Sequence, residues 1–339
     1  FDVTAAGHFE GRSILNVKAP AAEVAQDLGL SEEAFGNIIA NAKTALYAHR
    51  ISRPSPFRDE KILTAWNGLM ISAFARAGLL LDNPEYIQAA QTAARFVLKN
   101  LYQNQRLLRS YKDGQARHKA YLDDYAFFVA ALLDLFEADP DPFWFETALT
   151  LDETMSHQYE DKIGGGFFMT ADDHEDLIAR EKPGYDGAVP SGNAIAVMNL
   201  LRLSVLTSDD TYRQRAADTM AAFSKSFRSS PLGLSEMMLA LDFSLASPTD
   251  LVIVTPENTP RAGEPFLKAF RNVYLPNRVL IQVKQGKHAA KLATLMPLVK
   301  GKADQGVKPV AYVCAKGICH LPSFTVEAFT SQIRQSQGQ

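Results

Sequence analysis

Four short polar segments stand directly before or within the first turns of stretches that are otherwise almost uncharged. They read RPSPFRDEK, AYLDDYAFF, YDGAVPSGNA and GLSEMM, and they supply the carboxylates Asp59, Asp123, Asp124, Asp186 and Glu236. A pair of carboxylates, one of which holds its proton near neutral pH, is what acid–base chemistry on a glycosidic bond requires. The types and grouping of these residues therefore predict a site for an oxygen-rich ligand such as a sugar.

We assign the catalytic roles within this candidate site to Asp59 and Asp124. The candidate substrate contacts are Trp66, Asn67, Tyr121, Asp123, Tyr125, Asp186, Ser191 and Asn193.

Structural roles compete with these functional ones. Asp59, Asp123 and Ser191 occupy positions where a helix N-cap belongs, and capping alone would explain an isolated carboxylate or hydroxyl there. The adjacent pair Asp123 and Asp124 exceeds what one cap needs, and a second carboxylate beside two tyrosines is costly unless it is solvated or paired. The pair is therefore the strongest functional signal in the sequence.

Trp66, Asn67 and Gly68 lie inside an otherwise apolar stretch. We favour core packing for Trp66, with a sugar-stacking platform as the alternative. A buried Asn67 requires hydrogen-bond partners, and Gly68 permits close approach of a second backbone.

Helical patterns extend from about residue 31 to residue 247 and are of two kinds. Nearly uncharged stretches begin at Ile62, Tyr125 and Ser191, whereas the stretches from Pro84 and Thr211 are amphipathic. A helix that is apolar on all sides must be buried on all sides, and an amphipathic helix has one wet face. Their alternation predicts an inner ring of helices wrapped by an outer ring, an (α/α) toroid of about eight helices. A solenoid of helix pairs is the alternative, although no sequence signature repeats.

A shared direction of the inner helices would bring the four polar segments to one mouth. Helix N-termini present free N–H groups and the positive end of the helix dipole. We therefore expect the candidate residues to converge there, with at least one partly buried carboxylate whose pKa is raised.

The pattern changes after Ser247. Runs beginning at Leu251, Arg278 and Val310 predict strands, with helices near Glu264–Arg271 and Ala289–Leu295 between them. We therefore divide the chain into a helical part, residues 1–248, and a small α/β appendage with a tail, residues 249–339.

No metal or cofactor site is predicted. Among the seven histidines only His118 lies near a polar segment, and none has metal-ligand spacing with another. GGGFF, from Gly164, lacks the spacing and lysine of a phosphate-binding loop. Cys314 and Cys319 are predicted to be structural thiols at the end of the Val310 strand, which favours a cytoplasmic location.

Composition narrows the remaining classes of function. The chain has 339 residues, 47% of them hydrophobic, and a formal net charge of −3, which argues against nucleic acid as a partner. The apolar stretch from Ile62 to Leu81 contains Asn67 and Arg76, so a buried helix is expected there and not a membrane span. No signal peptide is visible, and the chain begins at Phe1 in loop-like sequence, from which we expect a fragment.

Long motifs in order along the chain resemble a known family. PFRDEKILTAWNGLMISA, YLDDYAFF, GGGFFMTADD, YDGAVPSGNAIAVMNLLRL and VCAKGICHLP are similar to the C-terminal half of the YyaL-type proteins, relatives of the spermatogenesis-associated thioredoxin-like protein of animals. The resemblance implies a toroid of the six-hairpin glycosidase type, here incomplete. It also implies that an N-terminal thioredoxin-like domain and the first part of the toroid are missing from this chain.

Two functions follow as hypotheses. The first is a carbohydrate-active enzyme, either glycosidase-like or a sugar epimerase or isomerase. Epimerases and isomerases of related toroids work with histidines, and His118 is the one histidine near a polar segment here. The second is a non-catalytic scaffold that binds a ligand or serves the thioredoxin-like domain as a partner surface. Fold resemblance alone does not decide between them.

Overall fold

The computed structural model describes residues 1–174, 178–259, 261–303 and 306–337. It divides into two compact units, residues 1–60 and residues 61–339. The first unit contains two helices that pack together, α1 (Ala21–Asp27) and α2 (Glu32–Ile51). Ser31 caps α2 by accepting a hydrogen bond from the amide of Ala34, and this confirms the helix predicted from residue 31.

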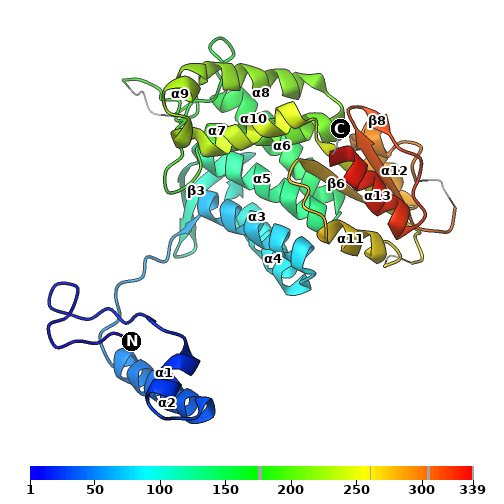
Figure 1. The fold of residues 1–339 in the computed structure, drawn as a ribbon. Helices are drawn as coiled ribbons and strands as arrows, with labels where there is room; N and C mark the ends of the chain where they lie inside the picture. Colours follow the sequence, from blue (N-terminus) through cyan, green and yellow to red (C-terminus); the bar gives the residue numbers. More distant parts are fainter. Residues whose placement is uncertain (175–177, 260, 304–305, 338–339) are drawn as a thin grey trace. The chain divides into compact units, whose positions relative to one another are not determined.

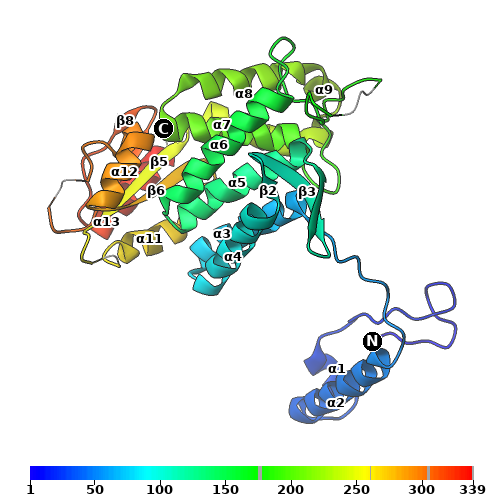
Figure 2. The ribbon, with the colours of Figure 1, turned by 180° about the vertical axis from the view of Figure 1, so that it is seen from behind.

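Two layers of helices form the larger part of the second unit (Figures 1 and 2). The first layer is α3 (Thr64–Leu81), α5 (Leu122–Ala138), α7 (Gly192–Thr207) and α10 (Ser235–Ala246), in which each helix packs against the next. The second layer is α4 (Pro84–Asn100), α6 (Pro142–Tyr159) and α8 (Asp210–Ala222), which pack against α3, α5 and α7 respectively. The first-layer helices are called the inner helices below.

Burial follows the two kinds of sequence pattern. Almost every residue of α5 and α7 is buried, whereas α4 buries one face through Ala90, Ala94 and Val97. The predicted pairing of apolar and amphipathic helices is therefore confirmed. Within the described residues, α3 and α10 share no extensive contact of the kind that joins the other neighbouring inner helices, so the inner helices form a row whose ends are α3 and α10.

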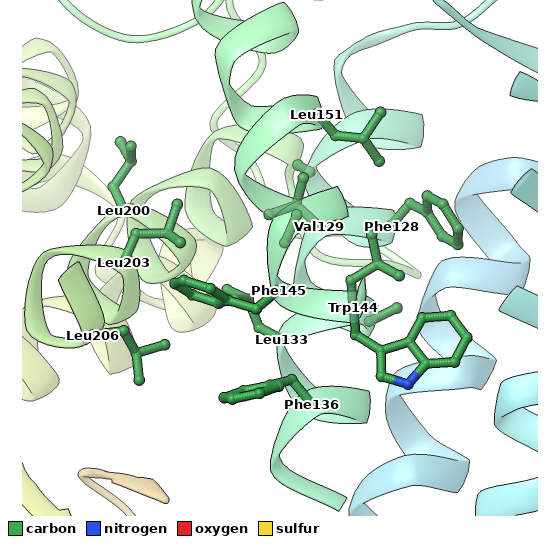
Figure 3. Close-up of a cluster of buried hydrophobic side chains, with 14 of the residues drawn as sticks. Phe128, Val129, Leu133, Phe136, Trp144, Phe145, Leu151, Leu200, Leu203 and Leu206 are labelled. Atoms are coloured by element: carbon green, nitrogen blue, oxygen red, sulfur yellow. The ribbon is translucent and has the colours of Figure 1, made fainter. Parts of the chain in front are cut away.

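Large apolar side chains fill the space between α5, α6 and α7 (Figure 3). Phe136 on α5 and Phe145 on α6 are fully buried with ring centroids 5.5 Å apart, and Leu203 of α7 is buried in the same cluster. Burial of one such side chain contributes about 1.5–3 kcal/mol. This core holds the inner helices in fixed positions relative to one another.

Three elements of the helical part differ from the sequence-based expectation. The helix predicted from Thr211 through Phe227 breaks at Phe223 and continues as α9 (Ser224–Ser229), followed by a short 3-10 helix at Pro231–Leu234. Residues Ile62–Leu63, expected to be helical, form β1. Three antiparallel strands that were not predicted separate α4 from α5, and they are β2 (Tyr102–Gln103), β3 (Arg106–Lys112) and β4 (Gln115–Lys119).

The C-terminal part is a mixed four-stranded sheet in the order β6-β5-β7-β8, with β5 parallel to β6 and antiparallel to β7. Its elements are β5 (Thr249–Thr255), α11 (Glu264–Arg271), β6 (Arg278–Lys284), α12 (Lys287–Leu295), a 3-10 turn at Pro297–Val299, β7 (Val310–Ala315), β8 (Ile318–Cys319) and α13 (Val326–Gln337). All three predicted strands and both predicted helices are present. The boundary predicted after residue 248 falls between α10 and β5, and both belong to one compact unit, so the division into two domains stays a prediction.

One sheet face packs against α11 and α13, and the other packs against α12 and the inner helices. The second contact includes a buried charge network, in which Arg202 of α7 pairs with Asp134 and Glu137 of α5. Arg278 of β6 also pairs with Glu137. Breaking such a network by removing one partner is strongly destabilising, because a buried charge is left without compensation.

Cys314 and Cys319 are joined by a disulfide, so the expectation of two free thiols is wrong. Their predicted place at the end of the Val310 strand is confirmed. Lys316 and Gly317 connect strands β7 and β8, and both residues have a positive φ, as the two central residues of a type I′ hairpin turn do. This turn places the two cysteines opposite each other, and the C-x4-C spacing alone did not reveal it. No helix in the described residues has the length and apolar character needed to cross a membrane.

Candidate functional site

Asp124 ties the N-terminal ends of α3 and α5 together. Its Oδ1 accepts a hydrogen bond from the amide of Ala65 and its Oδ2 accepts one from the amide of Tyr121, both at 2.9 Å. Only 1% of the residue is exposed, and burial raises the pKa of its carboxyl group to about 6. Asp124 therefore acts as a brace between two helix ends, and the catalytic role predicted for it stays a prediction.

Asp123 lies between α5 and α7. A Cβ atom added to Gly192, the first residue of α7, would lie 2.4 Å from Asp123 Oδ1, so only glycine leaves room for the carboxylate there. Within the described residues Oδ1 is buried without a hydrogen-bond partner, and loss of water raises the pKa of the group. Tyr121 and not Asp123 occupies the N-cap of α5, so the capping interpretation of Asp123 is wrong.

Asp186 joins the ends of α7 and α10. Its Oδ1 accepts a hydrogen bond from the amide of Ser191, and its Oδ2 accepts one from the amide of Glu236, both at 2.8 Å. Ser191 caps α7 by accepting a bond from the amide of Ala194, as the capping interpretation predicted. Glu236 is half-buried, and desolvation, followed by the nearby Asp186 charge, raises the pKa of its carboxyl group.

Asn193 is fully buried and holds the loop before α7. Its Oδ1 accepts a hydrogen bond from the amide of Phe167, and its Nδ2 donates to the carbonyls of Phe167 and Pro183. These bonds fix the GGGFF segment against the first turn of α7. Asn193 thus holds the loop that borders the candidate site. Because its side chain is buried and bonded to the backbone, it is not available to contact a substrate.

Three residues predicted as substrate contacts have different environments. Trp66 is 63% exposed, so the core interpretation is wrong and its indole is accessible. Asn67 is half-buried and donates to the carbonyl of Leu63, the N-cap residue of its helix. Tyr125 is fully buried, and its hydroxyl accepts a hydrogen bond from the amide of Leu107, so it belongs to the core.

Asp59 belongs to the N-terminal unit, residues 1–60, whereas the other candidates belong to the second unit. Leu63 occupies the N-cap of α3, so the capping interpretation of Asp59 is wrong. Its catalytic assignment stays a prediction.

Sequence reasoning missed two residues that border the candidate site. Arg109 of β3 lies over the Tyr121 ring, 4.7 Å from its centroid, with Nη1 3.6 Å from Asp124 Oδ2. On Tyr121 the imidazole of His174 is stacked at 5.5 Å between ring centroids. Desolvation and the charge of Lys119 lower the pKa of His174, so its ring is neutral near pH 7. His118, the histidine considered from sequence, is an exposed residue of β4.

These contacts bring the N-terminal ends of α3, α5, α7 and α10 to one edge of the helical layer. The segment RPSPFRDEK with Asp59 belongs to the other unit, so the predicted convergence of all four polar segments on one mouth stays a prediction. The edge, called the N-terminal edge below, carries the exposed Trp66, the half-buried carboxyls of Asp123 and Glu236, and the Arg109–Tyr121–His174 stack. No group of three or more metal-ligating side chains is found within the described ranges. Carboxyls with raised pKa values, an arginine and an open indole are groups that can bind and protonate an oxygen-rich ligand.

Comparison with known proteins finds relatives whose sequences match nearly the whole length of this chain. No family model matches the chain. It is 32% identical over 327 residues to human spermatogenesis-associated protein 20, covering 93% of this chain and 41% of that protein. The rat protein of the same name is 31% identical over 329 residues, and an uncharacterised protein of Caenorhabditis elegans is 27% identical over 331 residues, covering 41% and 44% of those relatives.

The chain is homologous to spermatogenesis-associated protein 20. It spans about two-fifths of the length of the spermatogenesis-associated protein 20 relatives that it matches. Among solved structures, a cellobiose 2-epimerase from Spirochaeta thermophila is similar over 48% of this chain and 43% of its own, with 20% identity and a TM-score of 0.41. A GH76 α-mannanase from Bacteroides thetaiotaomicron is similar over 57% and 61%, with 14% identity and a TM-score of 0.43.

Proposed function

We propose that this chain forms part of a carbohydrate-active protein whose sugar site lies along the N-terminal edge of the inner helices. The observation that carries the proposal is the state of Asp123. Its carboxyl group lies against the first residue of α7, has a raised pKa, and keeps one oxygen without a hydrogen-bond partner among the described residues. Burial raises the pKa of this carboxyl group and so shifts its titration towards neutral pH, which is the direction that a general acid requires.

The chemistry proposed is proton transfer to or from a sugar oxygen. Asp123 is the proton donor, and Glu236 is a second carboxyl group on the same edge whose pKa is also raised. Asp124 and Asp186 position the helix ends, because both oxygens of each accept backbone amides. The exposed indole of Trp66 offers an apolar face on which a sugar ring can stack.

A non-catalytic scaffold is the second candidate. The observation that favours a scaffold is that Asp124 and Asp186 have structural roles. Both oxygens of each carboxylate accept hydrogen bonds from backbone amides, so two of the four carboxylates on this edge are not available for catalysis. A scaffold of this kind would bind a ligand or a thioredoxin-like domain at the N-terminal edge and release no product.

The test is binding of a panel of mono- and oligosaccharides to the full-length protein, followed by analysis of products. We expect one sugar class to bind and to be converted. The Asp123→Asn variant should still bind that sugar, but its turnover should fall at least tenfold, because a general acid typically contributes about a hundredfold or more to the rate. Asp210→Asn is the matched control, because Asp210 is an exposed carboxylate at the start of the outer helix α8. Binding without conversion supports the scaffold, and turnover that Asp123→Asn leaves unchanged contradicts the enzyme.

A further inference from the structure

The disulfide Cys314–Cys319 has one buried and one accessible end. Cys314 is 1% exposed within β7, whereas Cys319 is an exposed residue of β8, the edge strand of the C-terminal sheet. A thiolate from solution can therefore reach Cys319, while the sulfur of Cys314 is shielded from water. In thiol–disulfide exchange access helps to decide which sulfur is attacked, and the other sulfur leaves as a thiolate. A thiolate shielded from water is costly, so the leaving sulfur of Cys314 is favoured to take up a proton.

A carboxyl group lies beside the shielded end. Asp250 of β5 is the antiparallel partner of Cys314, and Cys314 is the antiparallel partner of Cys319. Side chains of directly paired residues project from the same face of a sheet with Cβ atoms about 4.5–5.5 Å apart. Asp250, Cys314 and Cys319 thus form a row across three adjacent strands on one sheet face.

The surroundings leave Asp250 available to transfer a proton. It is half-buried, and its Oδ1 is buried without a hydrogen-bond partner among the described residues. Lys302 is the charged group facing it, but the two form no ion pair in the described structure, and Lys302 Nζ donates instead to the carbonyl of Leu298. Burial raises the pKa of Asp250 to about 7, and the Lys302 charge opposes this rise.

We propose that Cys314–Cys319 is a reversible redox centre, reduced by an external dithiol, in which Asp250 exchanges a proton with the sulfur of Cys314. This centre is separate from the proposed sugar site and does not rest on it. Its reductant class is a dithiol that can reach the exposed edge of the sheet.

The steps balance as follows. One thiolate of the dithiol attacks the Cys319 sulfur, the Cys314–Cys319 bond breaks, and its electron pair passes to the Cys314 sulfur, which takes the proton of the Asp250 carboxyl group. The second thiol of the dithiol, as its thiolate, then attacks the first sulfur of the same dithiol, which is bonded to Cys319. The sulfur of Cys319 leaves as a thiolate. The protein gains two electrons, and the dithiol becomes a cyclic disulfide. On reoxidation by a disulfide the carboxylate of Asp250 takes the proton back from Cys314.

The experiment measures the rate of reduction by dithiothreitol from about pH 6 to pH 9, with acid quenching, alkylation and mass spectrometry of the cysteine peptide. The full-length protein is compared with Asp250→Asn and with Asp242→Asn. Asp242 is an exposed carboxylate of α10 that accepts a hydrogen bond from Asn277, so it is a matched control. Because the thiolate fraction of the reagent is the same for all variants at a given pH, the ratio of wild-type to variant rates isolates the protein's contribution.

We expect Asp250→Asn to slow reduction roughly tenfold near pH 6, a modest effect for a general acid. The ratio should fall towards one as pH rises through the Asp250 pKa of about 7, whereas the ratio for Asp242→Asn should be one throughout. Lys302→Met should move the fall to higher pH, because the Lys302 charge lowers the pKa of Asp250. A ratio of one at every pH for Asp250→Asn, or a disulfide that dithiothreitol does not reduce in the folded protein, would overturn the proposal.

The wild-type protein alone also gives a test if Asp250→Asn does not fold. Its reduction rate divided by the thiolate fraction of dithiothreitol should decrease as pH rises through about 7. A flat profile would contradict a proton donor at Asp250.

Discussion

Asp124 and Ala65 lie 59 positions apart in the sequence, and the carboxylate of one accepts the backbone amide of the other at 2.9 Å. The bond satisfies a free amide in the first turn of α3 with a side chain from the first turn of α5. Helix N-termini leave amides that must find acceptors, and here the acceptor comes from the neighbouring helix. This arrangement requires the two helices to begin at the same edge.

Asp124→Ala should therefore destabilise the protein through two helix ends at once. Two buried amides lose their acceptor, and we expect the free energy of unfolding to fall by about 3 kcal/mol. Asp141→Ala is the comparison, since Asp141 caps only α6 through Phe143 and its loss should cost about 1 kcal/mol. Urea unfolding of the full-length protein measures both, and equal losses for the two variants would contradict the bracing role.

The raised pKa of Asp124 predicts a specific dependence of stability on pH. The folded chain holds the Asp124 proton up to a pKa of about 6, whereas the unfolded chain releases it near the ordinary aspartate pKa of 3.8. Between these values the folded state binds more protons, so the free energy of unfolding should fall as pH rises from 4 to 6, at about 1.4 kcal/mol per unit at most.

In Asp124→Asn this contribution is absent. The difference in unfolding free energy between wild type and variant should decrease across pH 4 to 6 and be constant above about pH 7. Parallel stability curves for the two proteins would show that the Asp124 pKa is the same in the folded and unfolded states.

The inner helices were predictable from sequence because their stretches are long and nearly uncharged. Burial on all sides holds for α5 and α7, whereas α3 and α10 leave apolar residues such as Met70 and Leu239 exposed. The N-cap role of Ser191, the close packing at Gly68 and the common edge of the inner helices followed from local rules. The strands β2 to β4 were missed because RLLRSYK is short and carries charges at half-buried positions, so it has neither a buried-strand nor a helical pattern.

The distribution of roles among the carboxylates was less predictable. Asp123 and Asp124 have the same side chain, and their environments differ because the turn of α5 directs one towards α3 and the other towards α7. The stacking of His174 on Tyr121 brings together residues from distant loops, which no spacing rule reports. The disulfide depended on the positive φ of Lys316, a residue type without a strong preference for that conformation.

The open row of inner helices predicts self-association of the chain when it is expressed alone. Met70 of α3 is 54% exposed and Leu239 of α10 is 56% exposed, on the two helices that end the row. Large exposed apolar patches promote association. We expect Met70→Lys with Leu239→Lys to raise the monomer fraction in sedimentation velocity, whereas Ile163→Lys, on an exposed loop residue, should leave it unchanged. A monodisperse wild-type monomer would contradict this expectation.

Gly68 sets the distance between α3 and α5, and with it the geometry of the N-terminal edge. A Cβ atom at Gly68 would lie 2.8 Å from the backbone carbon of Phe127, a contact that no side-chain movement relieves. Gly68→Ala should force the two helices apart, cost about 1–3 kcal/mol of stability, and lengthen the hydrogen bond between Ala65 and Asp124.

Gly36→Ala in α2 is the matched control for Gly68→Ala. A Cβ atom at Gly36 meets nothing within 4 Å, and alanine should stabilise that helix by up to about 1 kcal/mol. Amide hydrogen exchange measures protection in the two helices separately. Gly68→Ala should speed exchange of the Ala65 amide and leave α2 unchanged, whereas Gly36→Ala should slow exchange in α2. If Gly68→Ala left the Ala65 amide as protected as in the wild type, the inner helices would not be held by close backbone packing, and the carboxylate edge would lack the rigidity that acid–base chemistry needs.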